Sequence, residues 1–202
     1  MPRIARWVLL AALVLLGAGY VFAFAIFVRD SEDFIAARRN SAAESFAAQH
    51  LVHPTAELKF APGAPFNGIL GAGWHNIEPH GVWSSATDSS IAIRLPRGYA
   101  GVVLQLNATA FIAPRAPHAI VTLTVNGHSQ TWERNGDNAG EPLQMRVPED
   151  LLRAGRLDIH VHLSRVASPF ATRAGRDHRP LGILLSSIVI QADAEKAVSV
   201  KR

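Results

Sequence analysis

Two short polar clusters hold the residue types that could do chemistry. The first runs from Gly73 to Ser84 and contains two of the four Trp residues, Trp74 and Trp83, together with Glu78. The second, residues 177–182, reads Asp-His-Arg-Pro-Leu-Gly. An indole can stack on a sugar ring or plug the open end of a β-sandwich, and a carboxylate can bind a ligand or anchor a loop. Because Trp and paired carboxylates at loop bases commonly hold loops in place, the structural alternative is the favoured one.

An ion pair between Glu78 and Arg179 is predicted to join the two clusters. Each is the charged residue at the centre of its cluster, and the clusters flank strands that a sandwich must bring together. Arg94 and Arg176 remain alternative partners for Glu78. If the pair is buried, removing one partner costs about 3–5 kcal/mol, since the other charge is left uncompensated.

A third pattern, in residues 157–163, places two histidines and an aspartate at alternate positions. On a strand, Asp158, His160 and His162 point to one side, and imidazole with carboxylate is a familiar zinc ligand set. Such neighbours lie about 6.6 Å apart along the strand, however, and the apolar residues between them already define a core face. We therefore expect this trio to face solvent. No catalytic, cofactor or metal residue is predicted, because no known catalytic or phosphate-binding motif occurs in the chain.

Composition limits the classes that remain. The chain has 202 residues, 49% of them hydrophobic, and no Cys. That length suits one ordinary domain plus an attachment, and the lack of Cys excludes disulfides and thiolate metal sites. The formal net charge of +4 fits contact with anionic lipid or glycan. Nucleic acid is not expected as a partner, because the basic residues form no compact run.

An uncharged apolar segment from Trp7 to Val28 predicts a transmembrane helix. It would span roughly 33 Å, enough to cross the hydrocarbon core of a bilayer. The small-x-small triplet at 23–25 offers a cleaved signal peptide as the alternative. A retained anchor is favoured because the apolar run continues beyond that triplet. Arg3 and Arg6 favour a cytoplasmic N-terminus, which places the rest of the chain outside the cytoplasm.

A second helix is predicted from Asp30 to Val52, with Ser31 as its N-cap and Pro54 ending it. Its apolar stripe is thin, so a stalk and a docking helix for a membrane partner are both open. The expected organisation is a cytoplasmic stub and anchor (1–29), a helical linker (30–55), a β-sandwich domain (56–192) and a tail (193–202).

From Glu57 onward, alternation of apolar and polar residues predicts short strands separated by Pro and Gly turns. Asn126-Gly127, between two runs of β-formers, is the signal for a type I′ hairpin. Many short strands without helices between them predict a mainly β fold: an antiparallel, jelly-roll-like β-sandwich carrying an N-terminal transmembrane helix and a short linker helix. The expected strands are 57–61, 91–95, 102–111, 120–125, 128–133, 143–147, 157–163 and 183–190.

Four motifs in order resemble a non-catalytic β-sandwich domain found appended to bacterial cell-envelope glycosyltransferases. They are the 73–84 cluster with the strand at 91–95, the 123–127 hairpin, Ser168-Pro169, and the 177–183 cluster. The likeness covers about Gly71 to Gln191. Carried over position by position, it marks Trp74, Glu78, Trp83, Asp177, Arg179 and Gly182 as candidate glycan-contact or structural residues.

The resemblance implies a jelly-roll-like domain that serves surface polysaccharide assembly without catalysing a reaction. No transferase domain accompanies the motifs here, so a membrane protein partner such as a glycosyltransferase is implied. The expectation is a non-enzymatic accessory or assembly subunit in the bacterial inner membrane, with its domain in the periplasm. Two alternatives stand beside it: a glycan-binding module that stacks sugars on Trp74 and Trp83, and a structural subunit of another membrane complex.

Overall fold

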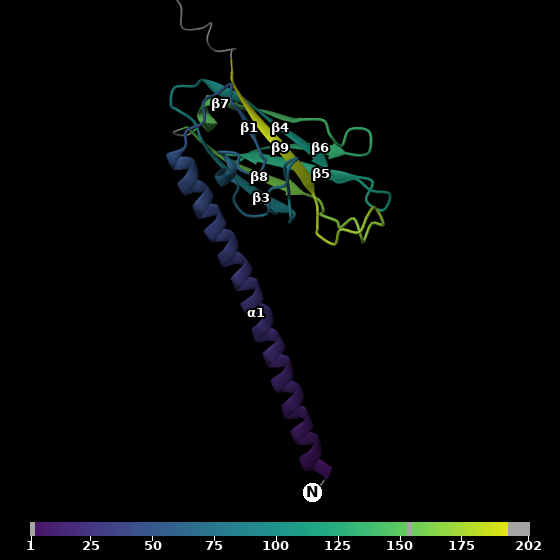
Figure 1. Cartoon of the computed structure of the whole chain (residues 1–202). Helices are drawn as coiled ribbons and strands as arrows, with labels where there is room; N and C mark the ends of the chain where they lie inside the picture. The colour runs from purple at the N-terminus through teal and green to yellow at the C-terminus, as the bar shows by residue number, and fades with distance from the viewer. Residues whose placement is uncertain (1–2, 153–154, 194–202) are drawn as a thin grey trace, which may run out of the picture. The chain divides into compact units, whose positions relative to one another are not determined.

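The computed structural model describes residues 3–152 and 155–193, with side chains from residue 13 onward. Contacts divide the chain into two compact units, Met1–Arg38 and Arg39–Arg202. The first consists of helix, and the second contains the β-structure (Figure 1). The predicted domain boundaries at 29/30, 55/56 and 192/193 remain predictions, and residues 194–202 of the predicted tail lie outside the described residues.

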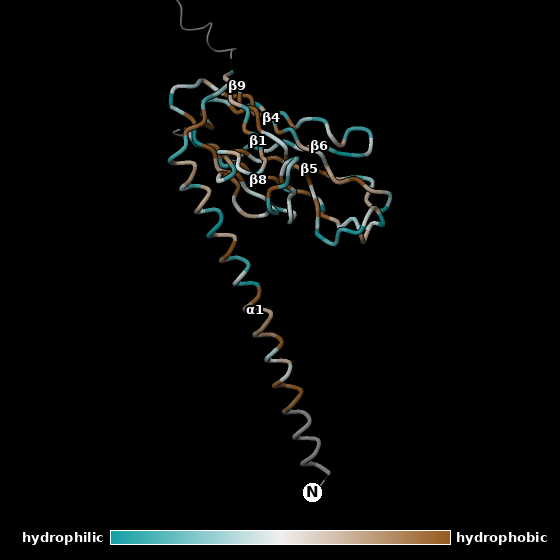
Figure 2. The backbone as a smooth tube through the Cα atoms, in the orientation of Figure 1, coloured by the Kyte–Doolittle hydropathy of each residue, from teal (hydrophilic) through white to brown (hydrophobic). Residues whose placement is uncertain are grey.

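Helix α1 runs without interruption from Arg3 to Gln49. Its described part is long and apolar enough to cross a membrane, by length and composition. Its large apolar side chains are exposed; Leu16, for example, has 76% of its surface exposed. Hydrophobic residues dominate its N-terminal described turns, and strongly hydrophilic ones begin in its C-terminal half (Figure 2). The described part of the helix is therefore apolar toward its N-terminal end and polar toward its C-terminal end (Figure 2).

The sequence predicted two helices here, and the structure has one. Ser31 does not cap a new helix, because its hydroxyl donates to the carbonyl oxygen of Val28 one turn earlier. Nothing between Val28 and Ser31 breaks the helical hydrogen bonds, so the span and the predicted linker are continuous. The helix also ends before Pro54, at Gln49, where the ring of His50 stacks on Phe46 and bonds to its carbonyl oxygen.

The β-structure forms two antiparallel sheets that face each other as a sandwich (Figure 1). Sheet A has the order β1-β9-β4-β7, with β2 also pairing with β9, and sheet B has the order β3-β8-β5-β6. The predicted mainly β sandwich is confirmed. The strands are β1 (Glu57–Lys59), β2 (Val82–Trp83), β3 (Asp88–Arg94), β4 (Gly101–Ala110), β5 (Ala119–Val125), β6 (His128–Arg134), β7 (Leu143–Pro148), β8 (Arg156–Leu163) and β9 (Ile183–Ala192), with 3-10 turns η1 (Asn67–Ile69) and η2 (Glu149–Leu151).

The core lies between the sheets and follows the predicted alternation. In β4 the side chains of Val102, Leu104 and Leu106 are fully buried, and in β8 those of Leu157 and Ile159 are. Each such side chain contributes about 1.5–3 kcal/mol to folding when it leaves water. The period of two therefore fixes which face of each strand points inward.

The Asn126-Gly127 hairpin is confirmed. Its two residues have φ values of 50° and 89°, as a type I′ turn requires. The Asn126 side chain also bonds outside the turn: its Nδ2 donates to the carbonyl oxygens of Leu151 and Arg156, and its Oδ1 accepts from the Asp158 amide. The turn thus fixes the β5–β6 register and ties the hairpin to β8.

The last turns of α1 belong to the sandwich unit. Ala43 and Ala47 are buried against Ala92 on the outer face of sheet B. Asn40 adds a polar anchor, because its Oδ1 accepts from the Ala72 amide at 2.8 Å and from the Ser90 hydroxyl at 2.6 Å. These small side chains let the helix approach the sheet closely, so this part of the predicted linker packs on its own domain.

Candidate functional site

The first polar cluster folds as a tight loop that leads into β2. Glu78 and Gly81 exchange backbone hydrogen bonds of 2.8 and 3.2 Å across a two-residue turn. Gly81 has φ 138°, and a side chain there would collide with the carbonyl of Leu185 in β9. The loop therefore lies directly against sheet A, with Glu78 and Gly81 at the base of the turn and Pro79 and His80 at its tip.

Trp74 is a buried structural residue and offers no surface on which a sugar could stack. Only 4% of it is exposed, and its indole N–H donates to the Ser90 carbonyl oxygen at 2.9 Å. Arg39 donates to the Trp74 carbonyl oxygen at 3.2 Å. Since a stacking platform must be open to solvent, the sugar-stacking alternative is wrong for Trp74.

Trp83 lies in a different environment. It pairs with Leu184 of β9, and because its neighbour Val82 faces the core, Trp83 faces outward from sheet A. It is half-buried, and the ring of Phe111 meets it edge to face at a centroid distance of 6.3 Å. Of the two motif tryptophans, only Trp83 has a surface that a ligand could contact.

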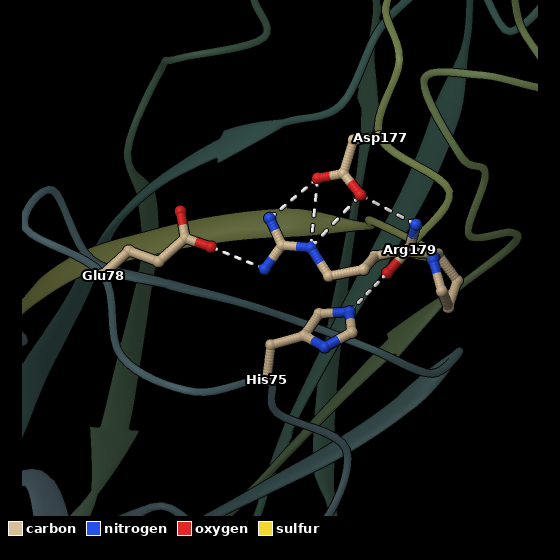
Figure 3. Close-up of polar contacts among 5 residues, drawn as sticks. His75, Glu78, Asp177 and Arg179 are labelled. Carbon is tan, nitrogen blue, oxygen red and sulfur yellow. Dashed lines mark hydrogen bonds and ion pairs between the residues drawn. The ribbon is translucent and has the colours of Figure 1, made fainter.

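Arg179 joins the two clusters through a pair of carboxylates (Figure 3). Its Nη1 donates to Glu78 Oε1 at 2.6 Å, which confirms the predicted ion pair. Its Nε and Nη2 donate to the carboxylate of Asp177 at 3.0 and 2.7 Å, and its backbone N–H donates to the same carboxylate at 2.8 Å. The guanidinium is thus held from both sides.

His75 adds a second link between the same segments. A ring nitrogen, Nε2, lies 2.7 Å from the carbonyl oxygen of Pro180, so Nε2 carries the proton and donates it (Figure 3). The bond spans 105 residues of sequence. Together His75, Glu78, Asp177 and Arg179 form what we term the loop clamp.

The charges of the loop clamp perturb one another. Hydrogen bonds from the Arg179 side chain and backbone lower the pKa of Asp177 to about 2. The same carboxylate, and then Glu78, raise the pKa of Arg179. The side chains of Arg179 and Glu78 are 44% and 36% exposed, so the pair is not buried. The condition for the 3–5 kcal/mol expectation is therefore not met, and a value near that of a surface pair applies.

Gly182 serves packing. Its position leaves no room for a methyl group, which would meet the side chains of Leu163, Ser84 and Val166. The buried Ser84 hydroxyl accepts from the Ile183 amide at 2.9 Å. Only glycine lets the two motif segments lie this close together, just before β9 begins.

The histidine–aspartate trio of β8 does not converge. Asp158 pairs with Arg156, and His162 pairs across the sheet with Asp88 at 2.7 Å. The hydrogen bond from His162 lowers the pKa of Asp88. In the described part of the chain, no three His, Asp or Glu side chains gather as metal ligands would.

Sequence reasoning found Glu78, Asp177 and Arg179 but missed the supporting residues. His75, Ser84 and Ser90 bond to backbone atoms far along the chain, and no spacing rule predicts such bonds. Beside the clamp, a shallow cavity of about 410 Å³ is lined by Arg39, Asn67, Gly68, Trp74, His75 and Ile77 among others.

No family model matches this chain, and no curated protein matches it either. Among solved structures, a cycloalternan-forming enzyme from Listeria monocytogenes in complex with a pentasaccharide substrate aligns with a TM-score of 0.35 and 15% identity, covering 59% of this chain and 10% of the enzyme. A xylan-binding module, CBM15, aligns with a TM-score of 0.31 and 11% identity, covering 68% of this chain and 97% of the module. Likenesses this distant identify no family and assign neither ligand nor activity to this chain.

Proposed function

We propose that this chain is a membrane-anchored, non-catalytic accessory or assembly subunit of bacterial envelope polysaccharide machinery, with its N-terminus in the cytoplasm and its sandwich in the periplasm. The observation that carries the proposal is how the motif residues are used. Glu78, Asp177 and Arg179 are bonded to one another, and Trp74 is buried. Side chains engaged in this way hold loops together, as a scaffold for protein contact requires.

The partner in this proposal is a membrane protein, and a glycosyltransferase is the class that the motif resemblance implies. Contact along α1 is favoured because Phe34 and Ile35 remain 63% and 54% exposed just beyond the apolar span. Exposed apolar residues beside a membrane span suit packing against another helix.

Affinity purification from detergent-solubilised membranes tests the proposal. The tagged chain should enrich a glycosyltransferase, identified by mass spectrometry, and the double variant Phe34→Ser/Ile35→Ser should lose it. Leu51→Ser is the matched control, since Leu51 is also exposed, at 52%, but lies outside the helix.

Deletion of the gene provides the cellular test, with altered surface polysaccharide as the expected result. Normal polysaccharide in the deletion strain, together with purification that enriches no glycosyltransferase or other membrane protein over the control, would refute the proposal.

A further inference from the structure

The centre of the outer face of sheet A combines uncharged polar side chains with a few apolar ones. Cross-strand partners point to the same side of a sheet, so the strand registers assign the residues of this face. In β4 the buried residues Leu104 and Leu106 alternate with outward ones, and the outward ones are half-buried or exposed. The central members of this outer face are Trp83, Val103, Gln105, Asn107, Thr109, Gln144, Leu184, Val189 and Gln191.

Amide side chains form an ordered row along this face. Gln105 Nε2 donates to Asn107 Oδ1 at 2.8 Å, and Asn107 Nδ2 donates to Ser187 Oγ at 2.8 Å. These bonds fix the orientation of the amides before any ligand arrives, which lowers the entropic cost of binding. By contrast, Gln144 and Thr109 are exposed and make no side-chain hydrogen bond to any residue that the structure describes. The row thus combines fixed amides with free donors and acceptors.

Trp83 lies at one end of the row, in register with Leu184 and Thr109. Within the described chain its indole N–H has no acceptor, and it is not among the buried polar atoms that lack one. The N–H is therefore open to solvent, unlike that of Trp74. Phe111 packs against the ring of Trp83 in a T-shaped arrangement and helps to hold it in place.

Charge is confined to the margins of this face. On one side Lys59 pairs with Glu57 at 3.4 Å, and elsewhere Arg146 pairs with Asp193. No charged residue occupies the central positions of β4 or β9 that face outward. A neutral ligand is thus a better match than an acidic one, since an acidic chain would gain no ion pair at the centre and the marginal cations are already paired with carboxylates.

The dimensions fit an extended chain. From Val103 to Thr109 the face is about 20 Å long, at roughly 3.3 Å per residue. A polymer with hydroxyls along its length and apolar C–H faces on its rings offers partners for both the amides and the indole. A protein ligand would instead need a continuous apolar centre, whereas the apolar residues Val103, Val189 and Leu184 of this face lie beside Gln191, Gln105 and Thr109 in the strand registers.

We propose that the outer face of sheet A binds a neutral polysaccharide, with Trp83 stacking against one sugar ring and Gln105, Thr109 and Gln144 bonding hydroxyls of the following ones. This inference goes beyond the proposed assembly role, which requires a protein partner and no bound sugar. It also places the sugar contact away from the loop clamp. Of the proposed contact residues, only Trp83 belongs to a sequence motif.

Affinity electrophoresis of the full-length chain in detergent micelles tests it. The gels contain hydroxyethylcellulose, xylan, glucomannan or dextran, with alginate as the acidic comparison. At least one neutral polysaccharide should retard the chain. The double variant Gln105→Ala/Gln144→Ala should weaken that binding by about tenfold, because two hydrogen-bonding groups are lost. Its melting temperature should stay unchanged. The matched control is Thr124→Ala/Ser129→Ala on the outer face of sheet B, which should bind as wild type does.

Trp83→Ala should abolish retardation. If that variant unfolds, Trp83→Phe provides the second measurement, and it should bind more weakly than wild type while remaining folded. Three results would overturn the inference: no retardation in any neutral gel, equal loss in the sheet B control, or retardation by alginate alone that salt removes. Because no partner protein is present in these gels, a negative result here leaves the assembly proposal to its own purification test.

Discussion

At the scale of single residues, the loop clamp is held by charges that remain accessible to water. Asp177 accepts hydrogen bonds from both the side chain and the backbone of Arg179, which explains why its pKa falls so far below 3.8. The clamp should therefore depend on pH in a window set by that carboxyl.

We expect the stabilisation from Asp177 to be complete above about pH 4 and to disappear as the pH falls toward 2. The sign follows because a carboxyl with a lowered folded-state pKa binds protons more readily in the unfolded chain. The measurement is the melting temperature of wild type and Asp177→Asn between pH 7 and pH 2. The two curves should differ at neutral pH and converge below pH 4, and a constant gap would show that the carboxylate charge has no role.

The Glu78–Arg179 pair should contribute modestly. Because both side chains are more than a third exposed, a coupling of about 0.2–1 kcal/mol is expected from a double-mutant cycle with Glu78→Gln and Arg179→Gln. Arg179→Gln should cost more than Glu78→Gln, since it also removes the bonds to Asp177. Denaturant unfolding measures both effects, and it should show the coupling decrease with added salt. Strictly additive effects would mean that the contact contributes nothing.

At the scale of elements, the Asn126-Gly127 turn is a place where the local sequence alone requires one backbone conformation. A side chain at Gly127 would meet no atom within 4 Å, so any cost of adding one arises from the φ of 89° alone. Gly127→Val should lower the free energy of unfolding by about 1–3 kcal/mol.

Gly136→Val is the matched control for the turn. Gly136 also lies in open space but is not among the glycines with positive φ, so its substitution should change stability little. Equal melting temperatures for Gly127→Val and wild type would mean that the turn tolerates a β-branched residue and does not set the register.

Strands with a clear period of two could be predicted from the sequence, and short or polar ones could not. β2 has only two residues, too few to show any period. β3 begins at Asp88, three residues before the apolar run, because its polar start pairs with β8 across the sheet. Contacts with distant strands decided both cases, and a local pattern contains no information about them.

Some features of the candidate site could be predicted from the sequence, and others could not. The Glu78–Arg179 pair was predictable because Glu78 is the carboxylate of the first motif and Arg179 is the cation of the second. The burial of Trp74 was the favoured interpretation, but its partners were not predictable: a carbonyl oxygen of β3 accepts its indole N–H, and Arg39 of α1 donates to its backbone carbonyl oxygen. The outward direction of Trp83 follows from its register with Leu184, which a two-residue strand does not reveal in sequence.

At the scale of the whole molecule, the proposed function depends on which side of a membrane the sandwich occupies. The described chain contains one helix able to span a bilayer, and that helix continues into the sandwich unit at Arg39. In the proposed function, the direction in which α1 crosses the membrane therefore decides the side on which the sandwich lies. Arg3 and Arg6 precede the apolar segment, and cationic residues on a short flank are retained in the cytoplasm.

We expect alkaline phosphatase fused after Arg202 to be active in cells, because this enzyme folds only outside the cytoplasm. Green fluorescent protein fused at the same place should be dark, because it fluoresces only when it folds inside the cytoplasm. The full-length chain should also sediment with membranes. Reversing the flank with Arg3→Glu and Arg6→Glu should reduce phosphatase activity in proportion to the chains that insert the other way. A fluorescent fusion with inactive phosphatase would place the sandwich in the cytoplasm. A mature N-terminus near Ile26 would instead identify a cleaved export signal, and the chain would then reach the periplasm without an anchor.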